Sequence, residues 1–156
     1  PRRAKRYSQY RYGGRRGDTL STVPFLSNTA LKQENYVVYV VDPDQAIADG
    51  LSTLLYTYDI EVVHYPDAES FLDCEAAKSC NNCCLLVEAN LPGMSGPALM
   101  HELRGIHVDL PVLLLIDTMT PAFVNVVNAS GRIGVLEKPL ANDALVSSIL
   151  RLRRAA

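Results

Sequence analysis

The strongest constraint on the fold is a regular alternation between apolar runs and segments with helical spacing across residues 36–154. The sequence predicts strands at 36–41, 60–65, 83–87, 112–116 and 133–136, and helices at 45–58, 68–78, 97–104, 121–129 and 141–151. Strands separated by helices imply right-handed crossovers and a parallel sheet with helices on both faces. Nearly continuous apolar strands fit a sheet that is covered on both sides. The expected fold class is α/β, a doubly wound (βα)5 domain with five parallel strands.

Two helix starts in this pattern have their own signals. Asp44 stands just before the helix predicted at 45–58, where an aspartate side chain can accept hydrogen bonds from the first turn. Pro97 suits the first turn of the helix at 97–104, because a first-turn residue has no intrahelical partner for its amide. The helix at 121–129 has weaker support, since valine and asparagine are poor helix formers.

The first 35 residues lack this alternation and are expected to lie outside the folded domain. Residues 1–17 mix arginine and lysine with tyrosine and glycine, which predicts a flexible basic arm. Residues 18–35 are rich in serine and threonine and are predicted to link the arm to a domain at 36–154. Two uses of the arm remain open. It can be a solvated leader, or it can bind nucleic acid by neutralising phosphates and stacking tyrosines on bases.

The overall charge and hydropathy exclude several classes of protein. A net charge of -2 argues against a strongly electrostatic nucleic-acid or membrane binder, although basic residues crowd the arm. No run approaches the ~20 apolar residues that span a bilayer, and the start does not read as a secretory signal. A cytoplasmic protein without a membrane partner is therefore expected.

Four cysteines lie close together, at Cys74, Cys80, Cys83 and Cys84. Cys80 and Cys83 have the CxxC spacing of zinc and redox sites. A structural zinc site needs four ligands, and the sequence has no second CxxC or HxxxH pair. Cysteine also serves as a small apolar residue in buried strands. We expect core and loop cysteines without a function, and the alternatives are an adventitious disulfide or a metal contact.

Three chemically active side chains are predicted to meet at one edge of the sheet. Asp42 follows the first strand, Glu88 ends the third, and Lys138 follows the fifth. The carboxyl ends of parallel strands share one edge, where open α/β sheets place their ligands. Magnesium takes oxygen ligands and an ammonium group pairs with phosphate oxygens, so this set can hold a cation and a phosphoryl group. The candidate metal ligands are Asp42, Asp44 and Glu88.

Three motifs resemble the receiver domains of bacterial response regulators, and the resemblance covers about residues 36–154. They are VVDPD at 40–44, EANLPGMSG at 88–96 and EKPL at 137–140. The resemblance implies a flavodoxin-like receiver fold and is greatest to the group fused to helix-turn-helix transcription factors of nitrogen-fixation and nodulation regulators. It also implies two adjacent acids after the first strand, an acceptor aspartate after the third, a threonine or serine after the fourth and a lysine after the fifth.

The chain departs from this pattern at the positions that would carry phosphorylation. Asp42 matches the first acid, but Pro43 takes the place of the second, with Asp44 one residue further on. Glu88 stands in place of the acceptor aspartate and is one methylene longer. The family lysine is present as Lys138, and the resemblance implies a cis bond to the proline that follows it.

Two further departures concern the contact to the phosphoryl group and its readout. Ile116 occupies the hydroxyl position, and Thr118, two residues later, could approximate it only if the loop moves. Val135 occupies the position of an aromatic switch in the fifth strand and is too small for such a rotamer change. Together the departures predict a degenerate receiver, in which Glu88 pairs permanently with Lys138 and holds the loops in one state. The alternative is a carboxylate satisfied by Lys138 without any signalling role.

The predicted function is a phosphorylation-independent signalling and interaction module, not an enzyme, in transcriptional regulation. The expected partner is a second copy, bound through the last helices and strand, or another signalling protein, and no cofactor is expected. One alternative is a working phosphoacceptor that takes its phosphoryl group from a histidine kinase with the help of Mg²⁺. Another is nucleic-acid binding through the arm or through a missing output domain.

Overall fold

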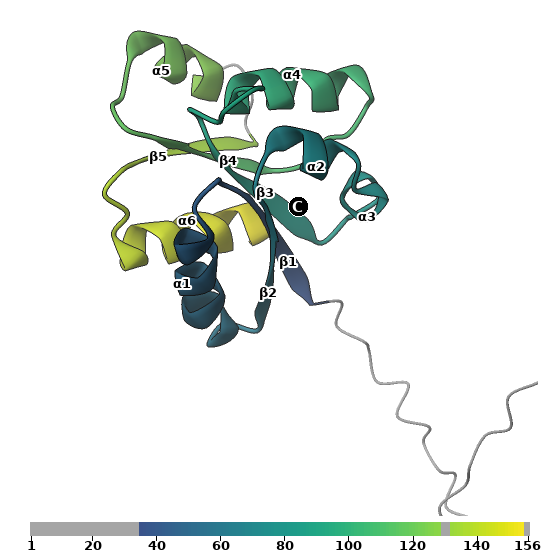
Figure 1. The fold of residues 1–156 in the computed structure, drawn as a ribbon. Helices are drawn as coiled ribbons and strands as arrows, with labels where there is room; N and C mark the ends of the chain where they lie inside the picture. The colour runs from purple at the N-terminus through teal and green to yellow at the C-terminus, as the bar shows by residue number, and fades with distance from the viewer. Residues whose placement is uncertain (1–34, 129–131, 155–156) are drawn as a thin grey trace, which may run out of the picture. The chain divides into compact units, whose positions relative to one another are not determined.

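A computed structural model describes residues 35–128 and 132–154, and Figure 1 shows their arrangement. In this part of the chain, five parallel strands form one sheet in the order β2-β1-β3-β4-β5. The strands are β1 (Tyr36–Val41), β2 (Ile60–Tyr65), β3 (Cys83–Glu88), β4 (Val112–Ile116) and β5 (Ile133–Glu137). The predicted α/β class is confirmed. The predicted arm at 1–17 and the linker at 18–35 lie outside the described residues, apart from Asn35.

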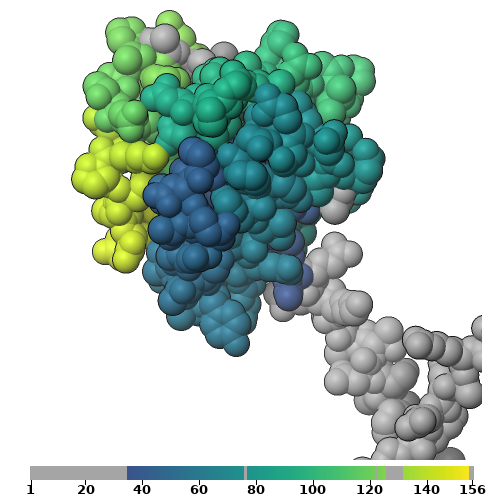
Figure 2. Space-filling view, viewed as in Figure 1, coloured from purple at the N-terminus to yellow at the C-terminus, as the bar shows by residue number. Residues whose placement is uncertain are grey.

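The described helices cover both faces of the sheet (Figure 1). They are α1 (Gln45–Tyr56), α2 (Ala68–Leu72), α3 (Glu75–Lys78), α4 (Gly96–Gly105), α5 (Pro121–Asn128) and α6 (Asn142–Arg154). One face carries α1 and α6, which lie side by side in the space-filling view (dark blue and yellow in Figure 2), and the other carries α2 to α5. Neighbouring strand residues point to opposite faces, so Leu85 packs under α2 and α4 whereas Leu86 packs under α1 and α6.

The prediction of one helix at 68–78 is wrong, because the chain divides there into α2 and α3. Asp67 caps the start of α2 by accepting a hydrogen bond from the Ser70 amide at 2.7 Å. Cys74 has extended backbone angles, with φ -80° and ψ 103°, and its amide donates to the Phe71 carbonyl at 3.0 Å. The extended residue ends the first helix before the second begins.

Two helix ends differ from their predicted positions by more than one residue. α1 ends at Tyr56 rather than at residue 58, and Asp59 then takes a left-handed conformation with φ 54°, which turns the chain into β2. α6 continues to Arg154 rather than ending at 151. Three arginines lie in its last turn, and their positive charges stabilise the helix by interacting with the negative end of its dipole. The predicted end of α5 at residue 129 lies outside the described residues.

Candidate functional site

The carboxyl ends of β1, β3 and β5 bring Asp42, Glu88 and Lys138 together, as their positions at the ends of parallel strands predicted. Lys138 Nζ donates a hydrogen bond to Glu88 Oε2 and lies 3.8 Å from Asp42 Oδ2. The side chains of Asp42 and Glu88 are 3% and 7% exposed, against 27% for Lys138. The site is therefore a pair of buried acids with one lysine at its opening.

Glu88 has a donor at both carboxylate oxygens. Oε1 accepts from the backbone amide of Asn90 at 2.8 Å, and Oε2 accepts from Lys138. The side-chain amide of Asn90 also donates to Asp117 Oδ2 at 3.0 Å, which joins the loop after β3 to the loop after β4. Both carboxylate oxygens of Glu88 thus already accept a hydrogen bond, and the bond from Lys138 is charge-assisted.

Asp42 is the less well paired of the two acids. Its Oδ1 accepts from the backbone amide of Asp44 at 2.8 Å, whereas its buried Oδ2 has no hydrogen-bond partner in the described structure. Burial raises the pKa of Asp42, against the opposing effects of the Asp44 amide and the Lys138 charge, and the negative charge of Glu88 raises it further. A raised carboxyl pKa means that folding favours the neutral acid.

Lys138 keeps its proton in this setting. Burial lowers the pKa of Lys138, but the hydrogen bond and charge of Glu88, together with the charges of Asp42 and Asp117, raise it by more. The backbone amide of Lys138 donates to the Ile116 carbonyl at 2.8 Å, which holds the residue after β5 beside the end of β4. Its peptide bond to Pro139 is cis, as the resemblance implied.

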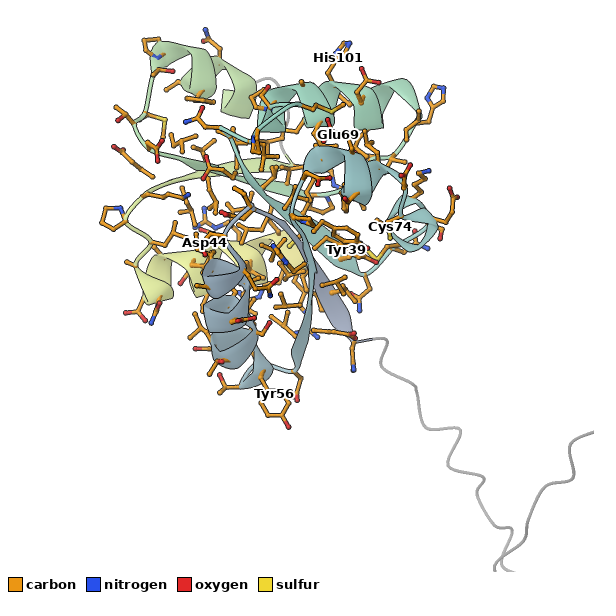
Figure 3. All side chains as sticks on the ribbon, viewed as in Figure 1. Tyr39, Asp44, Tyr56, Glu69, Cys74 and His101 are labelled. Atoms are coloured by element: carbon orange, nitrogen blue, oxygen red, sulfur yellow. A yellow bond between two sulfur atoms is a disulfide. The ribbon has the colours of Figure 1, made fainter. Side chains whose placement is uncertain are left out.

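The residues present do not fit a magnesium site. Asp44 accepts from the Ala46 amide at 2.9 Å and caps α1, at whose start Figure 3 shows it, so the capping prediction is confirmed. Pro43 offers no side-chain oxygen. Nowhere in residues 35–128 and 132–154 are three His, Cys, Asp or Glu side chains grouped to hold a metal ion. Magnesium needs several oxygen ligands in octahedral geometry, and Asp42 Oδ2 is the one buried carboxylate oxygen in the described part of the chain that has no donor.

The positions expected to contact and report a phosphoryl group are apolar or remote. Ile116 is 1% exposed and belongs to the core under α2 to α5. Thr118 is exposed in the loop after β4. Val135 is half-buried in β5, and none of the five residues of that strand is aromatic. The site therefore has neither a hydroxyl at the end of β4 nor an aromatic ring in β5.

The loop that follows Glu88 is packed tightly against the end of β3. A Cβ atom at Gly96 would lie 2.6 Å from the backbone oxygen of Glu88, so glycine is required for this approach. The Gly96 amide donates to the Ala89 carbonyl at 3.0 Å, and the Ser95 hydroxyl caps α4 by accepting from the Ala98 amide at 3.3 Å. These contacts fix the loop beside the Glu88 carboxylate.

Sequence reasoning missed three residues that support the site. Asn90 and Asp117 connect two loops, and their positions just after β3 and β4 were the available signal. His64 is part of β2, and its Nε2 lies 2.7 Å from the backbone oxygen of Asp42. Its place near the end of a strand beside β1 was the signal for that contact.

Comparison with known sequences supports one family. Residues 38–150 match the family model described as the response regulator receiver domain. The chain is 28% identical over 112 residues to the transcriptional regulatory protein FixJ of Bradyrhizobium diazoefficiens, which covers 72% of this chain and 54% of that protein. It is 26% identical over 125 residues to the response regulator protein TmoT of Ectopseudomonas mendocina, covering 80% and 56%. The chain thus spans about half the length of the curated relatives it matches.

Solved structures show the same fold. The response regulator StyR superposes with a TM-score of 0.65 at 28% identity, covering 76% of this chain and 59% of that chain. The crystal structure of FixJ-N gives a TM-score of 0.66 at 23% identity, covering 79% and 97%. The predicted flavodoxin-like receiver fold is therefore confirmed. None of the helices described in the structure is both long and apolar enough to cross a membrane. By its match over residues 38–150 and by its fold, the chain belongs to the family of response regulator receiver domains.

Proposed function

We propose that this receiver domain is a phosphorylation-independent interaction module of a transcriptional regulator. The observation that carries the proposal is the bond from Lys138 to Glu88. Glu88 stands where the resemblance implies an acceptor aspartate, and Lys138 stands where it implies the lysine that contacts the phosphoryl group. The longer acid already supplies the negative charge that this lysine would otherwise take from a phosphoryl group.

Burial makes this pairing hard to replace. The Glu88 side chain is 7% exposed, and an ion pair at low dielectric is stronger than one in water. Removing Lys138 from Glu88 would leave two acids, Glu88 and Asp42, facing each other without a cation. This cost supports a domain whose loops stay in one state without a phosphodonor.

The surface next to β5 supports a second copy as the partner. β5 is an edge strand of the described sheet, and edge strands offer unpaired backbone groups to another chain. A hollow of about 320 Å³ lies between β5 and α6, lined in part by Gly134, Val135 and Leu152. On the other side of β5, Val124 of α5 is 44% exposed. We define Gly134, Val135 and Val124 as the β5 surface and assign it to a homodimer contact.

A functional phosphoacceptor that receives its phosphoryl group from a histidine kinase with Mg²⁺ is the competing function. It is favoured by one observation, the unpartnered Oδ2 of Asp42, which is an oxygen of the kind that divalent cations bind. A titration with Mg²⁺ separates the two functions. Saturable binding that Glu88→Gln abolishes would support the phosphoacceptor, and its absence supports the interaction module.

The dimer is tested by sedimentation equilibrium of the full chain. We expect a concentration-dependent dimer whose dissociation constant is unchanged by acetyl phosphate and Mg²⁺. Val124→Asp should weaken it at least tenfold, because a charge would be buried in the contact. Ile106→Asp is the matched control, since Ile106 is 49% exposed at the end of α4 and lies outside the β5 surface. A monomer at all concentrations, or a dimer that forms only with the phosphodonor, would contradict the proposal.

A further inference from the structure

The cysteines form a second chemical feature, separate from the acidic site. Cys80 and Cys83 are joined by a disulfide, whereas Cys74 and Cys84 are free thiols. Cys83 is the first residue of β3 and Glu88 is the last, so the disulfide and the acids lie at opposite ends of one strand. The proposed function does not use the disulfide.

The Cys80–Cys83 bond contributes little as a structural staple. Its two cysteines are three residues apart, and the entropy that a cross-link removes from the unfolded chain falls as the closed loop becomes shorter. The segment is also held without the disulfide. Cys83 is paired with Val37 in the β1–β3 ladder, and the Val37 amide donates to the Asn82 carbonyl at 3.1 Å. A bond that adds little to the fold can break and re-form without unfolding the domain.

The two sulfur atoms differ in their access to solvent. Cys80 is half-buried in the loop after α3, whereas Cys83 is 1% exposed. A thiol from solution therefore reaches the sulfur of Cys80 first, and the buried Cys83 is the leaving group. Cys84 faces the opposite core and is fully buried, which keeps it out of such an exchange.

The neighbouring helix is weakly held, so the state of the disulfide can affect it. α3 has four residues. Cys74, which is labelled in Figure 3, stands at its start and makes no side-chain capping bond. Its ion pair between Lys78 and Glu75 is at the surface, where such pairs contribute little. The disulfide follows this helix directly and ties the segment after it to β3.

We propose that Cys80 and Cys83 form a reversible thiol–disulfide site that reacts with small thiols of the glutathione class. A reductant thiolate attacks the sulfur of Cys80, the S–S bond breaks, and Cys83 leaves as a thiolate that takes up a proton. A second reductant thiol attacks the mixed disulfide and releases Cys80 as a thiol. The protein gains two electrons and two protons, and the two reductant thiols become one disulfide.

The exchange is tested on the folded full chain in buffers with graded ratios of reduced to oxidised glutathione, followed by alkylation and peptide mass mapping. Cys80 and Cys83 should be protected from alkylation at low ratios, and both should become alkylated over the same range as the ratio of reduced to oxidised glutathione rises. Cys74 should be alkylated throughout. Cys80→Ser should abolish the transition, and Cys74→Ser, the matched control, should keep it.

Hydrogen exchange measured on both redox forms supplies the structural readout. In the reduced form, amides at 74–82 should exchange about tenfold faster, because the four-residue α3 and the loop after it open locally more often once Cys80 is no longer linked to β3. Amides of β4 should exchange at the same rate in both forms. Cysteines alkylated at every ratio, a disulfide that survives every ratio, or a transition that Cys74→Ser abolishes would each overturn the proposal.

Discussion

Lys138 Nζ is hydrogen-bonded to Glu88 and lies 3.8 Å from Asp42, so one cation serves two buried acids. Glu88 takes the direct bond. Asp42 keeps one carboxylate oxygen without a donor, and its burial raises its pKa. Lys138 therefore balances the charge of the two acids without a bound ion, and replacing it measures how much it contributes to stability.

Replacing Lys138 by methionine should lower the free energy of unfolding by about 2–4 kcal/mol. Two buried acids would lose their cation. The expected loss is at the lower end of the range for broken buried ion pairs, because Lys138 is 27% exposed and solvent weakens its interactions. Urea unfolding at neutral pH measures the change. Lys78→Met is the control, since the Lys78–Glu75 pair is at the surface and should cost less than about 0.5 kcal/mol. Equal losses of unfolding free energy for the two variants would show that the pairing of Lys138 with the buried acids contributes no more than a surface ion pair.

Adding a methyl group at Gly96 should destabilise the domain by about 1–3 kcal/mol. Its Cβ would lie 2.6 Å from the Glu88 backbone oxygen, so either the loop or the strand must shift. Gly50→Ala is the matched control, because no atom lies within 4 Å of its added Cβ in α1 and alanine favours helices. The unfolding temperature should therefore fall for Gly96→Ala and rise for Gly50→Ala. A stabilised Gly96→Ala would contradict the close packing of this loop.

Asp44 should behave as a helix cap and not as a cation ligand. Asp44→Ala should cost about 1 kcal/mol of unfolding free energy, because the Ala46 amide loses its acceptor. Asp44→Asn should recover most of this loss, since asparagine caps equally well without a charge. Denaturation of the two variants with and without Mg²⁺ checks both points. If Mg²⁺ stabilised the wild-type protein but neither variant, Asp44 would be a metal ligand.

The contribution of Lys138 to the free energy of unfolding should depend on pH in the alkaline range. Burial opposes the charged form, but Glu88 and Asp42 together raise its pKa above the ordinary value of 10.5. A lysine pKa that is raised by folding gives stability that is complete below the unfolded value and disappears as the pH rises through the folded value. The stability difference between wild type and Lys138→Met should thus be constant around neutral pH and shrink above 10.5. A difference that shrinks already near neutral pH would refute the assignment.

Much of the fold follows from local sequence patterns. Strand periodicity predicted the five strands, and the parallel order then placed Asp42, Glu88 and Lys138 at one edge. The helix at 68–78 could not be divided from sequence, because its break depends on the extended conformation of Cys74 rather than on a proline or glycine. Helical spacing alone does not report such a change of backbone conformation.

The details of the site depended on contacts between loops that no sequence period encodes. The bond from Asn90 to Asp117 joins residues 27 positions apart, and the contact of His64 with the Asp42 carbonyl depends on the register of β2 with β1. Asp44 was predicted both as a cap and as a ligand, and both roles fit its position in the sequence. The structure shows the bond to the Ala46 amide, which is a local contact.

Intact-mass spectrometry of the full chain, incubated with acetyl phosphate and Mg²⁺, tests the central claim most directly. A receiver domain with an acceptor aspartate, treated in parallel, shows that the donor is active. The pairing of Glu88 with Lys138, together with Ile116 at the hydroxyl position, predicts an unchanged mass. A phosphoryl adduct that maps to Glu88 would contradict the claim that this domain works without phosphorylation.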